Sequence, residues 1–183
     1  MTGVFAGDFV KAHRAGAAHL DQMCKIPVRE EADLVIASAG GFPKDINFYQ
    51  AHKALNNAGY MVREGGIIIF VAECREGLGS KVFENLVMKS PTPDSVIGEL
   101  EERLKERRFI LGEHKLYFMA RLAKKAKIFL VSSLPEEVVR KAFMEPYRRV
   151  DEALKAAYSH LGRDIKIAVM PYAGLTLPSK GES

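Results

Sequence analysis

The amino-acid sequence predicts a layered α/β fold in which a mainly parallel sheet is flanked by helices. Four short apolar segments rich in β-branched residues predict strands at residues 34–38, 67–72, 127–132 and 166–170. Each segment is apolar almost throughout instead of alternating with polar residues, which is typical of strands covered on both faces. Segments with helical periodicity lie between these strands, as the crossover connections of a parallel sheet require.

The elements at the start of the chain support this fold class. A helix is expected at residues 8–24, where Asp8 can cap the amino end and several alanines favour helix. A second helix is expected at residues 46–58, with Asp45 as its N-cap and Gly59 beyond its end. This helix and the strands on either side form a βαβ unit, so the domain is expected to be Rossmann-like.

The rest of the chain continues the same pattern. Further helices are expected at residues 80–88, 93–108, 115–124, 136–143 and 148–161. Residues 174–183 are expected to form a loop and tail. Because the sequence contains no internal repeat or low-complexity segment, residues 1–183 are expected to form a single domain.

Composition and charge exclude several classes of protein. With 183 residues, 48% of them hydrophobic, the chain can bury a core of its own. The net charge of +4 is spread over mixed acidic and basic residues, as in 99–108, which is typical of solvated helix faces rather than of a nucleic-acid surface. No apolar segment approaches the roughly 20 residues of a membrane span, and no signal peptide is visible. Two isolated cysteines fit a reducing environment, so we expect a cytoplasmic protein without a nucleic-acid or membrane partner.

The loops that follow the strands are the candidate sites, because ligands of open parallel sheets bind beyond the carboxyl ends of the strands. The first loop contains Gly40 and Gly41 directly before a helix, where free backbone N–H groups can bind an anion. Paired glycines also simply form turns, and the sequence contains neither a Walker A motif nor a complete GxGxxG motif. In the next loop, Arg75 either binds a substrate or pairs with Glu73 and Glu76.

The helix after the glycine loop has two contrasting faces. Helical spacing places four residues on the face toward the sheet, namely Phe48, Ala51, Leu55 and Ala58. Four polar residues fall on the opposite face, namely Tyr49, Gln50, Lys53 and Asn57, so Tyr49 is not needed for the core. The phenol, amide and ammonium of Tyr49, Gln50 and Lys53 either bind a carboxylate or hydroxyl group or belong to an ordinary solvated face, with Tyr49 partly packed under a loop.

Histidine spacing predicts no metal site. His114 and Lys115 follow Gly112 at another expected helix start, where His114 can act as an acid, a base or a hydrogen-bond donor, or only as a cap. The other four histidines have no partner at a spacing typical of metal ligands. No metal-binding residue is therefore expected in this chain.

Three motifs stand out in the first half of the chain. Residues 37–50 read ASAGGFPKDINFYQ, residues 53–55 read KAL, and residues 71–79 read VAECREGLG. In this order they resemble the C-terminal domain of the nickel-dependent lactate racemase family, and the similarity extends from Gly3 to Pro178. Several motifs in one order are far more specific than any one of them. The resemblance implies that the chain is equivalent to the C-terminal domain of a two-domain racemase.

The resemblance also implies an activity that is divided between two domains. Members of this family racemise or epimerise 2-hydroxy acids by hydride transfer to a nickel pincer nucleotide. The lysine that carries this cofactor, the nickel-binding histidine and the catalytic histidines belong to the N-terminal domain, so the isolated chain is expected to be inactive and to hold no cofactor. The family's Tyr-Gln-x-x-Lys cluster matches Tyr49, Gln50 and Lys53, which would bind and orient the substrate from one wall of the cleft.

Further substrate-binding candidates lie outside this cluster. A tryptophan of the lactate enzyme falls near His114, but this chain contains no tryptophan, which favours a 2-hydroxy acid other than lactate. The full set of these candidates is His114, Lys115, Arg75, Gly40 and Gly41.

Three hypotheses about function follow. The leading one is the C-terminal domain of a lactate racemase-like enzyme, whose partners are the N-terminal catalytic domain and a small 2-hydroxy acid. The alternative is a non-catalytic module that binds an anion or a nucleotide at the loop containing Gly40 and Gly41. A third hypothesis is an interaction domain whose exposed apolar surface pairs with a second copy to form a homodimer.

Overall fold

The computed structural model describes residues 2–108 and 110–180, and its main feature is a five-stranded parallel sheet. The strand order is β5-β4-β3-β2-β6. The strands are β2 (Ala32–Ser38), β3 (Val62–Val71), β4 (Lys127–Val131), β5 (Glu145–Tyr147) and β6 (Ile167–Met170). Four of them confirm the strands predicted from the apolar segments. The sequence does not predict β5, because three residues are too short for a periodic signal.

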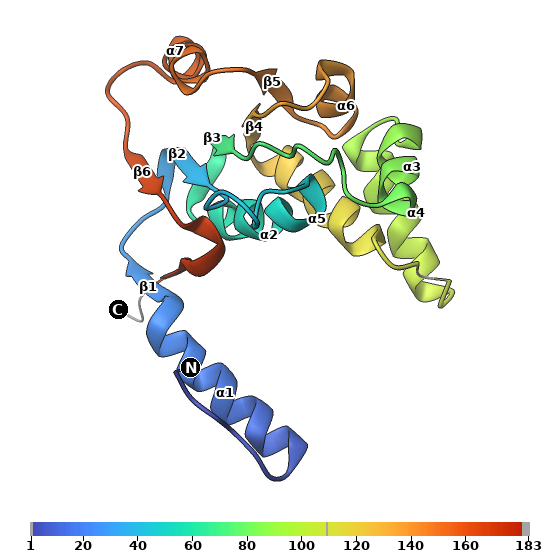
Figure 1. Cartoon of the computed structure of the whole chain (residues 1–183). Coiled ribbons are helices and arrows are strands. Elements are labelled where there is room, and N and C mark those ends of the chain that lie inside the picture. The colour runs from blue at the N-terminus through green and yellow to red at the C-terminus, as the bar shows by residue number, and fades with distance from the viewer. Residues whose placement is uncertain (1, 109, 181–183) are drawn as a thin grey trace.

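Helices cover both faces of this sheet, which confirms the predicted layered α/β fold (Figure 1). α2 (Phe48–Gly59) and α5 (Glu113–Lys125) lie on one face, and α7 (Val150–Leu161) lies on the other. Side chains along each strand alternate between the two faces. On β3, Ile68 packs into the core beneath α2 and α5, whereas Ile69 packs into the core beneath α7.

The other helices of the body lie along the connections between strands. They are α3 (Lys81–Lys89), α4 (Pro93–Lys105) and α6 (Glu136–Lys141). Ser80 caps α3 by accepting a hydrogen bond from the backbone N–H of Phe83, and Thr92 forms a capping box with Ser95 at the start of α4. Every helix expected from the sequence is present, with ends that differ by a few residues at most.

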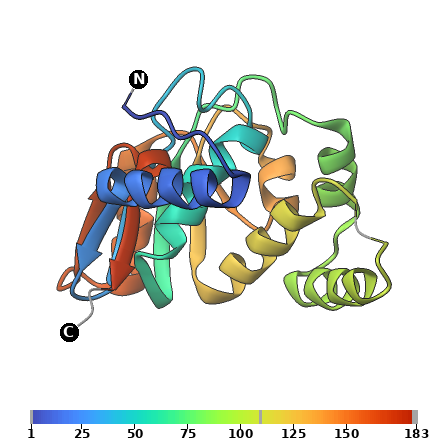
Figure 2. The ribbon, with the colours of Figure 1, turned by 90° about the horizontal axis from the view of Figure 1, so that it is seen from below.

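The amino-terminal helix lies apart from the sheet. α1 (Phe9–Cys24) begins after Asp8, whose carboxylate accepts a hydrogen bond from the backbone N–H of Lys11, and this confirms the predicted cap. The helix contains no buried residue, and Phe9 is 82% exposed. Figure 1 shows α1 extending away from the body, and Figure 2 shows it from below. Within the described residues, no helix has the length and apolar character needed to cross a membrane.

A two-stranded sheet joins the two ends of the described chain. β1 (Lys25–Val28) pairs in parallel with β7 (Leu177–Lys180), and the 3-10 turn η1 (Ala173–Leu175) precedes β7. The expectation of a loop and tail over residues 174–183 is therefore wrong for β7, and residues 181–183 lie outside the described part of the chain. Each strand has four residues including a proline, so neither carries a clear strand signal.

One edge of the main sheet is left open on the α7 face. α7 packs mainly against β3, β4 and β5. On β6, Ala168 and Met170 pack into the core on the α2 side, whereas Ile167 and Val169 are 41% and 65% exposed. The sheet therefore has an uncovered apolar strip at β6, formed by Ile167 and Val169.

Candidate functional site

A hollow of about 350 Å³ lies beyond the carboxyl end of β2. It is lined by Ala39, Pro43, Lys44, Gln50, Ala51, Lys53, Ala54, Gly174 and Leu175. Its residues come from the segment after β2, from the first turns of α2 and from the segment after β6. β2 leads into α2 on one face, whereas β6 is reached through α7 on the other, so the connections reverse direction between these strands. Ligands of open α/β sheets bind at such a reversal.

The backbone at the start of α2 is satisfied by the protein itself. Phe48 N donates to the carbonyl of Gly77 over 3.0 Å, and Tyr49 N donates to that of Leu78 over 3.2 Å. The next N–H group, of Gln50, donates to the side-chain oxygen of Asn47 over 3.1 Å. These three N–H groups of α2 are therefore not available to an anion, and anion binding at the loop containing Gly40 and Gly41 stays a prediction. Any positive charge at the hollow comes from side chains instead.

Asn47, and not Asp45, is the N-cap of α2. The predicted cap fails because the carboxylate of Asp45 accepts a hydrogen bond from Glu73 N over 3.2 Å, in the loop after β3. Asn47 is packed tightly against Gly79, where an added Cβ would lie 2.3 Å from the Asn47 side-chain carbon Cγ. Gly79 also has a φ of +84°, so both the space and the backbone require glycine there.

Gln50 and Lys53 face the hollow together. Lys53 Nζ donates a hydrogen bond to Gln50 Oε1 over 2.8 Å. This contact occupies an oxygen of Gln50 and leaves its amide N–H groups available to a ligand. The sheet-facing stripe of α2 is buried as predicted, with Phe48 and Leu55 both 0% exposed. The helix therefore holds Gln50 and Lys53 on a rigid base.

Tyr49 lies differently from its two neighbours. Its ring packs edge-on against Phe83 with 5.8 Å between centroids, and Lys115 Nζ lies 4.2 Å from the centroid of the same ring. The ring is half-buried against the main core, so the expectation that Tyr49 is not needed for the core is wrong. On the same helix, Asn57 Nδ2 donates to the carbonyl of Ala173 over 2.8 Å and so ties α2 to η1.

The start of α5 brings two further candidates to this side of α2. Lys115 is 6% exposed, and its pKa is lowered by burial and by the charge of Lys53. The pKa of His114 is lowered by burial and by the charge of Lys115. The positive charge of Lys53 therefore acts on Lys115, whose ammonium lies over the ring of Tyr49.

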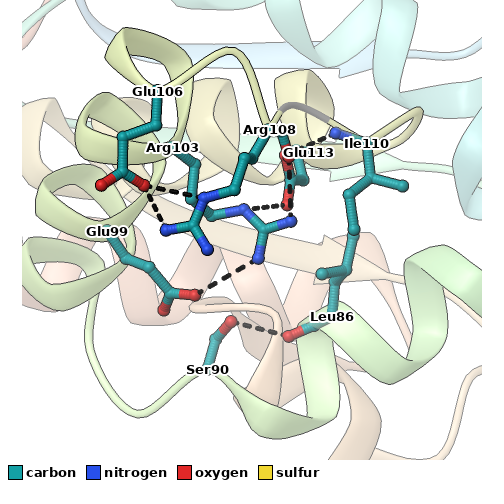
Figure 3. Close-up of polar contacts among 8 residues, drawn as sticks. All are labelled: Leu86, Ser90, Glu99, Arg103, Glu106, Arg108, Ile110 and Glu113. Atoms are coloured by element: carbon teal, nitrogen blue, oxygen red, sulfur yellow. Dashed lines mark hydrogen bonds and ion pairs between the residues drawn. The ribbon is translucent and has the colours of Figure 1, made fainter.

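A buried ion pair holds the start of α5 in place (Figure 3). Arg103 Nε of α4 lies 2.8 Å from Glu113 Oε1, and the Glu113 side chain is 1% exposed. The other carboxylate oxygen of Glu113 accepts a hydrogen bond from Ile110 N over 2.8 Å. The expectation of a solvated face over residues 99–108 is therefore wrong at Arg103. Its guanidinium connects two helices and orients the turn that carries His114.

Arg75 and the glycine pair lie at the same edge of the sheet. The guanidinium of Arg75 lies 5.1 Å from the Phe42 ring centroid and 3.8 Å from Glu73 Oε2, and all three side chains are exposed. Arg75 thus makes the local ion pair that the sequence left open, and it does not line the hollow. Gly40 N donates to the hydroxyl of Ser38 over 3.0 Å.

Two chemically important side chains were not identified from the sequence. Lys44 lines the hollow, and its position directly after the first predicted strand was the available signal. His52 is 2% exposed, its Nε2 has no hydrogen-bond partner within the described chain, and burial lowers its pKa from 6.5 to about 3. Helical spacing from Phe48 and Leu55 places His52 on the buried stripe, so this signal was also present.

Neither a metal centre nor a second, larger cavity adds to this site. Among residues 2–108 and 110–180, no group of three or more histidine, cysteine, aspartate or glutamate side chains could hold a metal ion. A larger cavity, of about 670 Å³, lies near the carboxyl end of α2 around Tyr60 and Arg121, and no predicted site residue lines it. Its position at the far end of α2 makes it a weaker candidate than the hollow beyond β2.

Comparisons with known proteins match nearly the whole chain. The lactate racemase C-terminal domain family matches residues 28–177. The chain is 32% identical over 172 residues to lactate racemase from Thermoanaerobacterium thermosaccharolyticum, and 31% identical over 174 residues to lactate racemase from Lactiplantibacillus plantarum. Each match covers 93% of this chain but only 40% of the relative.

Solved structures agree with the fold. The lactate racemase apoprotein from Thermoanaerobacterium thermosaccharolyticum superposes with a TM-score of 0.85 at 30% identity, covering 93% of this chain and 40% of that one. A crystal structure of a protein from Thermotoga maritima has a TM-score of 0.63 at 11% identity, and covers 94% of this chain and 43% of that one. The second similarity concerns the fold alone.

Proposed function

This chain belongs to the lactate racemase C-terminal domain family, and from that premise we propose that it forms one wall of the substrate cleft of a 2-hydroxy-acid racemase or epimerase. The observation that carries the proposal is the hollow beyond β2. It contains Gln50 and Lys53, and neither an aspartate nor a glutamate lines it. Its volume of about 350 Å³ suits a small molecule, at the lower end of the range for ligand pockets.

Lys53 and Gln50 bind and orient the substrate in this proposal. The ammonium of Lys53 pairs with the carboxylate of the 2-hydroxy acid, and it offsets negative charge that develops on the neighbouring oxygen. Because Gln50 Oε1 already accepts from Lys53, its amide N–H groups are left to donate to the substrate. Tyr49 supports Lys115 near Lys53, and this arrangement helps to position the site's charges.

The remaining chemistry comes from a second domain. The chain spans 40% of the length of the curated relatives that it matches. We propose that an N-terminal domain would provide the acid–base groups and would hold a nickel pincer nucleotide, which would supply the hydride-transfer chemistry. The described residues of this chain do not form a site for nickel, so none of them is assigned a step at the metal.

The exposed apolar surface suits such a partner. Phe9, Leu20 and Met23 of α1 are 82%, 56% and 52% exposed. Val169 of the uncovered β6 strip is 65% exposed. An N-terminal domain that covers these residues would remove apolar surface from water. A homodimer of this chain would bury the same residues, and sedimentation of the complete enzyme would distinguish the two.

The test is racemisation of 2-hydroxy acids by the complete enzyme that contains this chain, measured by chiral chromatography. We expect Lys53→Ala to lower kcat/KM by about 100-fold or more, because it removes the charge that binds the reacting group. Lys53→Arg should recover part of the loss. Lys89→Ala, an exposed lysine on α3, is the matched control and should leave turnover unchanged. Near-normal turnover by the Lys53→Ala enzyme would remove Lys53 from the site.

The isolated chain separates this proposal from a simple binding module. A C-terminal domain without its partner should show no racemisation. Turnover by the isolated chain would contradict the need for a second domain. Nucleotide binding by the isolated chain in calorimetry would favour the alternative, in which the loop containing Gly40 and Gly41 binds an anion or a nucleotide.

A further inference from the structure

The hollow contains a second lysine that a single carboxylate does not require. Lys44 lies in the loop between β2 and α2, and its backbone N–H donates to the carbonyl of Gly41 over 2.8 Å. Its side chain folds back over Gly40, where an added Cβ would lie 3.4 Å from Lys44 Cδ and 3.9 Å from Nζ. Gly40 also has a φ of +95°. The positive φ favours glycine at this position, and the Lys44 side chain lies at van der Waals distance above it.

Neither lysine of the hollow is neutralised by the protein. Within the described residues, no carboxylate lies within 4.0 Å of the Lys44 or Lys53 ammonium, and none lines the hollow. The nearest acidic residue in sequence, Asp45, directs its carboxylate to the backbone of Glu73. Four other lysines in the described chain pair with acids, among them Lys105 with Glu102 and Lys125 with Glu31. The hollow is thus a site of two uncompensated positive charges.

The walls of the hollow strengthen the effect of these charges. Ala39, Pro43, Ala54 and Leu175 contribute apolar surface. An ion that enters such surroundings loses water, and its attraction to an ammonium is stronger there than in bulk solvent. Small alanines also leave room for the carbon atoms that would join two charged groups of one ligand.

We propose that the hollow binds a 2-hydroxy acid that carries a second anionic group, with Lys53 pairing with the carboxylate beside the reacting carbon and Lys44 pairing with the second group. The second group is either a carboxylate or a phosphate, and both carry negative charge on oxygen. The inference rests on the proposed function and adds the class of substrate to it. Lys44 is then a specificity-determining residue and takes no part in the chemical step.

The test compares three substrates that differ only beyond the 2-hydroxy acid. Lactate has no second anionic group, malate has a carboxylate, and 3-phosphoglycerate has a phosphate. We expect the complete enzyme to show a kcat/KM at least tenfold higher for malate or 3-phosphoglycerate than for lactate, and the better of the two identifies the second group. Lys44→Leu should abolish that preference by raising KM for the dianion far more than KM for lactate. Lys44→Arg should retain it, and Lys89→Leu should change neither value.

The outcomes distinguish this inference from the function on which it rests. Efficient lactate turnover, without a preference for either dianion and without an effect of Lys44→Leu, would overturn the inference alone. Equal losses for lactate and the dianions in the Lys44→Leu enzyme would also overturn it, because Lys44 would then act on the shared part of the substrate. Failure of the wild-type enzyme to invert any 2-hydroxy acid would overturn the proposed function, and the inference with it. Circular dichroism of each variant checks that the fold is retained.

Discussion

The hollow beyond β2 and the junction between α4 and α5 both contain charged side chains, but the two regions differ in how these charges are compensated. At the junction, Glu113 is 1% exposed and lies 2.8 Å from Arg103. In the hollow, Lys44 and Lys53 are exposed, and no described carboxylate pairs with either. Compensated buried charge holds two helices together, whereas uncompensated charge at a surface hollow is available to a ligand. The comparison therefore separates charges that stabilise the fold from charges that bind.

The largest effect on stability is expected at the junction. Arg103→Leu would leave the carboxylate of Glu113 buried without its partner, and we expect the free energy of unfolding to fall by about 3 kcal/mol. Urea denaturation of the full chain at neutral pH measures this change. Arg140→Leu is the matched control, because Arg140 and Glu136 form an ion pair in which both side chains are 63% exposed. That pair should contribute less than about 1 kcal/mol. Equal effects of the two variants would contradict the distinction between the regions.

An intermediate effect is expected from His52, which lies between the two regions on the buried side of α2. Burial first, and then the charges of Lys115 and His114, lower its pKa from 6.5 to about 3. Between these values the unfolded chain binds a proton that the folded chain does not, so stability falls as the pH drops below 6.5. The loss should be about 1.4 kcal/mol per pH unit, or about 2 kcal/mol by pH 5.

The His52→Leu variant isolates this contribution. Urea denaturation at pH 7 and pH 5 should show a smaller loss of stability for the variant than for the wild type. His160→Leu is the control, since His160 is exposed on α7. A pH dependence that His52→Leu leaves unchanged would show that His52 is protonated as easily in the folded chain as in the unfolded chain.

The smallest effect on stability is expected in the hollow itself. Lys44→Leu and Lys53→Ala each remove an exposed ammonium without a carboxylate partner, so the free energy of unfolding should change by less than about 0.5 kcal/mol. Urea denaturation measures both. A loss as large as that of Arg103→Leu would show that these lysines stabilise the fold, and the contrast between the two regions would no longer hold.

Local sequence patterns were sufficient for most of the fold. The continuous apolar segments identify the buried strands, since both faces of the sheet are covered. Helical spacing identifies the buried face of α2, where Phe48 and Leu55 are fully enclosed. Asp8 and Ser80 cap helices through contacts with residues three positions away, and such contacts can be read from the sequence.

Contacts between distant segments account for what the sequence did not predict. The side chain of Asp45 could cap a helix, but its carboxylate accepts a hydrogen bond from the backbone N–H of Glu73 in another loop. Asn47 is the N-cap of α2 instead. From the sequence alone, Glu113 would be expected at the surface, whereas the folded chain buries it against Arg103 of α4. The candidate site shows the same limit. The sequence pointed to Gln50 and Lys53, whereas the hollow that they share with Lys44 is completed by Gly174 and Leu175, from the distant segment after β6.

The pairing of β1 with β7 has a consequence for the order in which the protein opens and closes. Lys25 pairs with Leu177, so nearly the whole domain forms a loop between the two strands, and closing that loop is costly in chain entropy. The unit β2-α2-β3, by contrast, is built from neighbouring segments and should form early. We therefore expect local opening to occur first at the short β1–β7 pair. Such opening would let α1 move relative to the main sheet without displacing the lysines of the hollow.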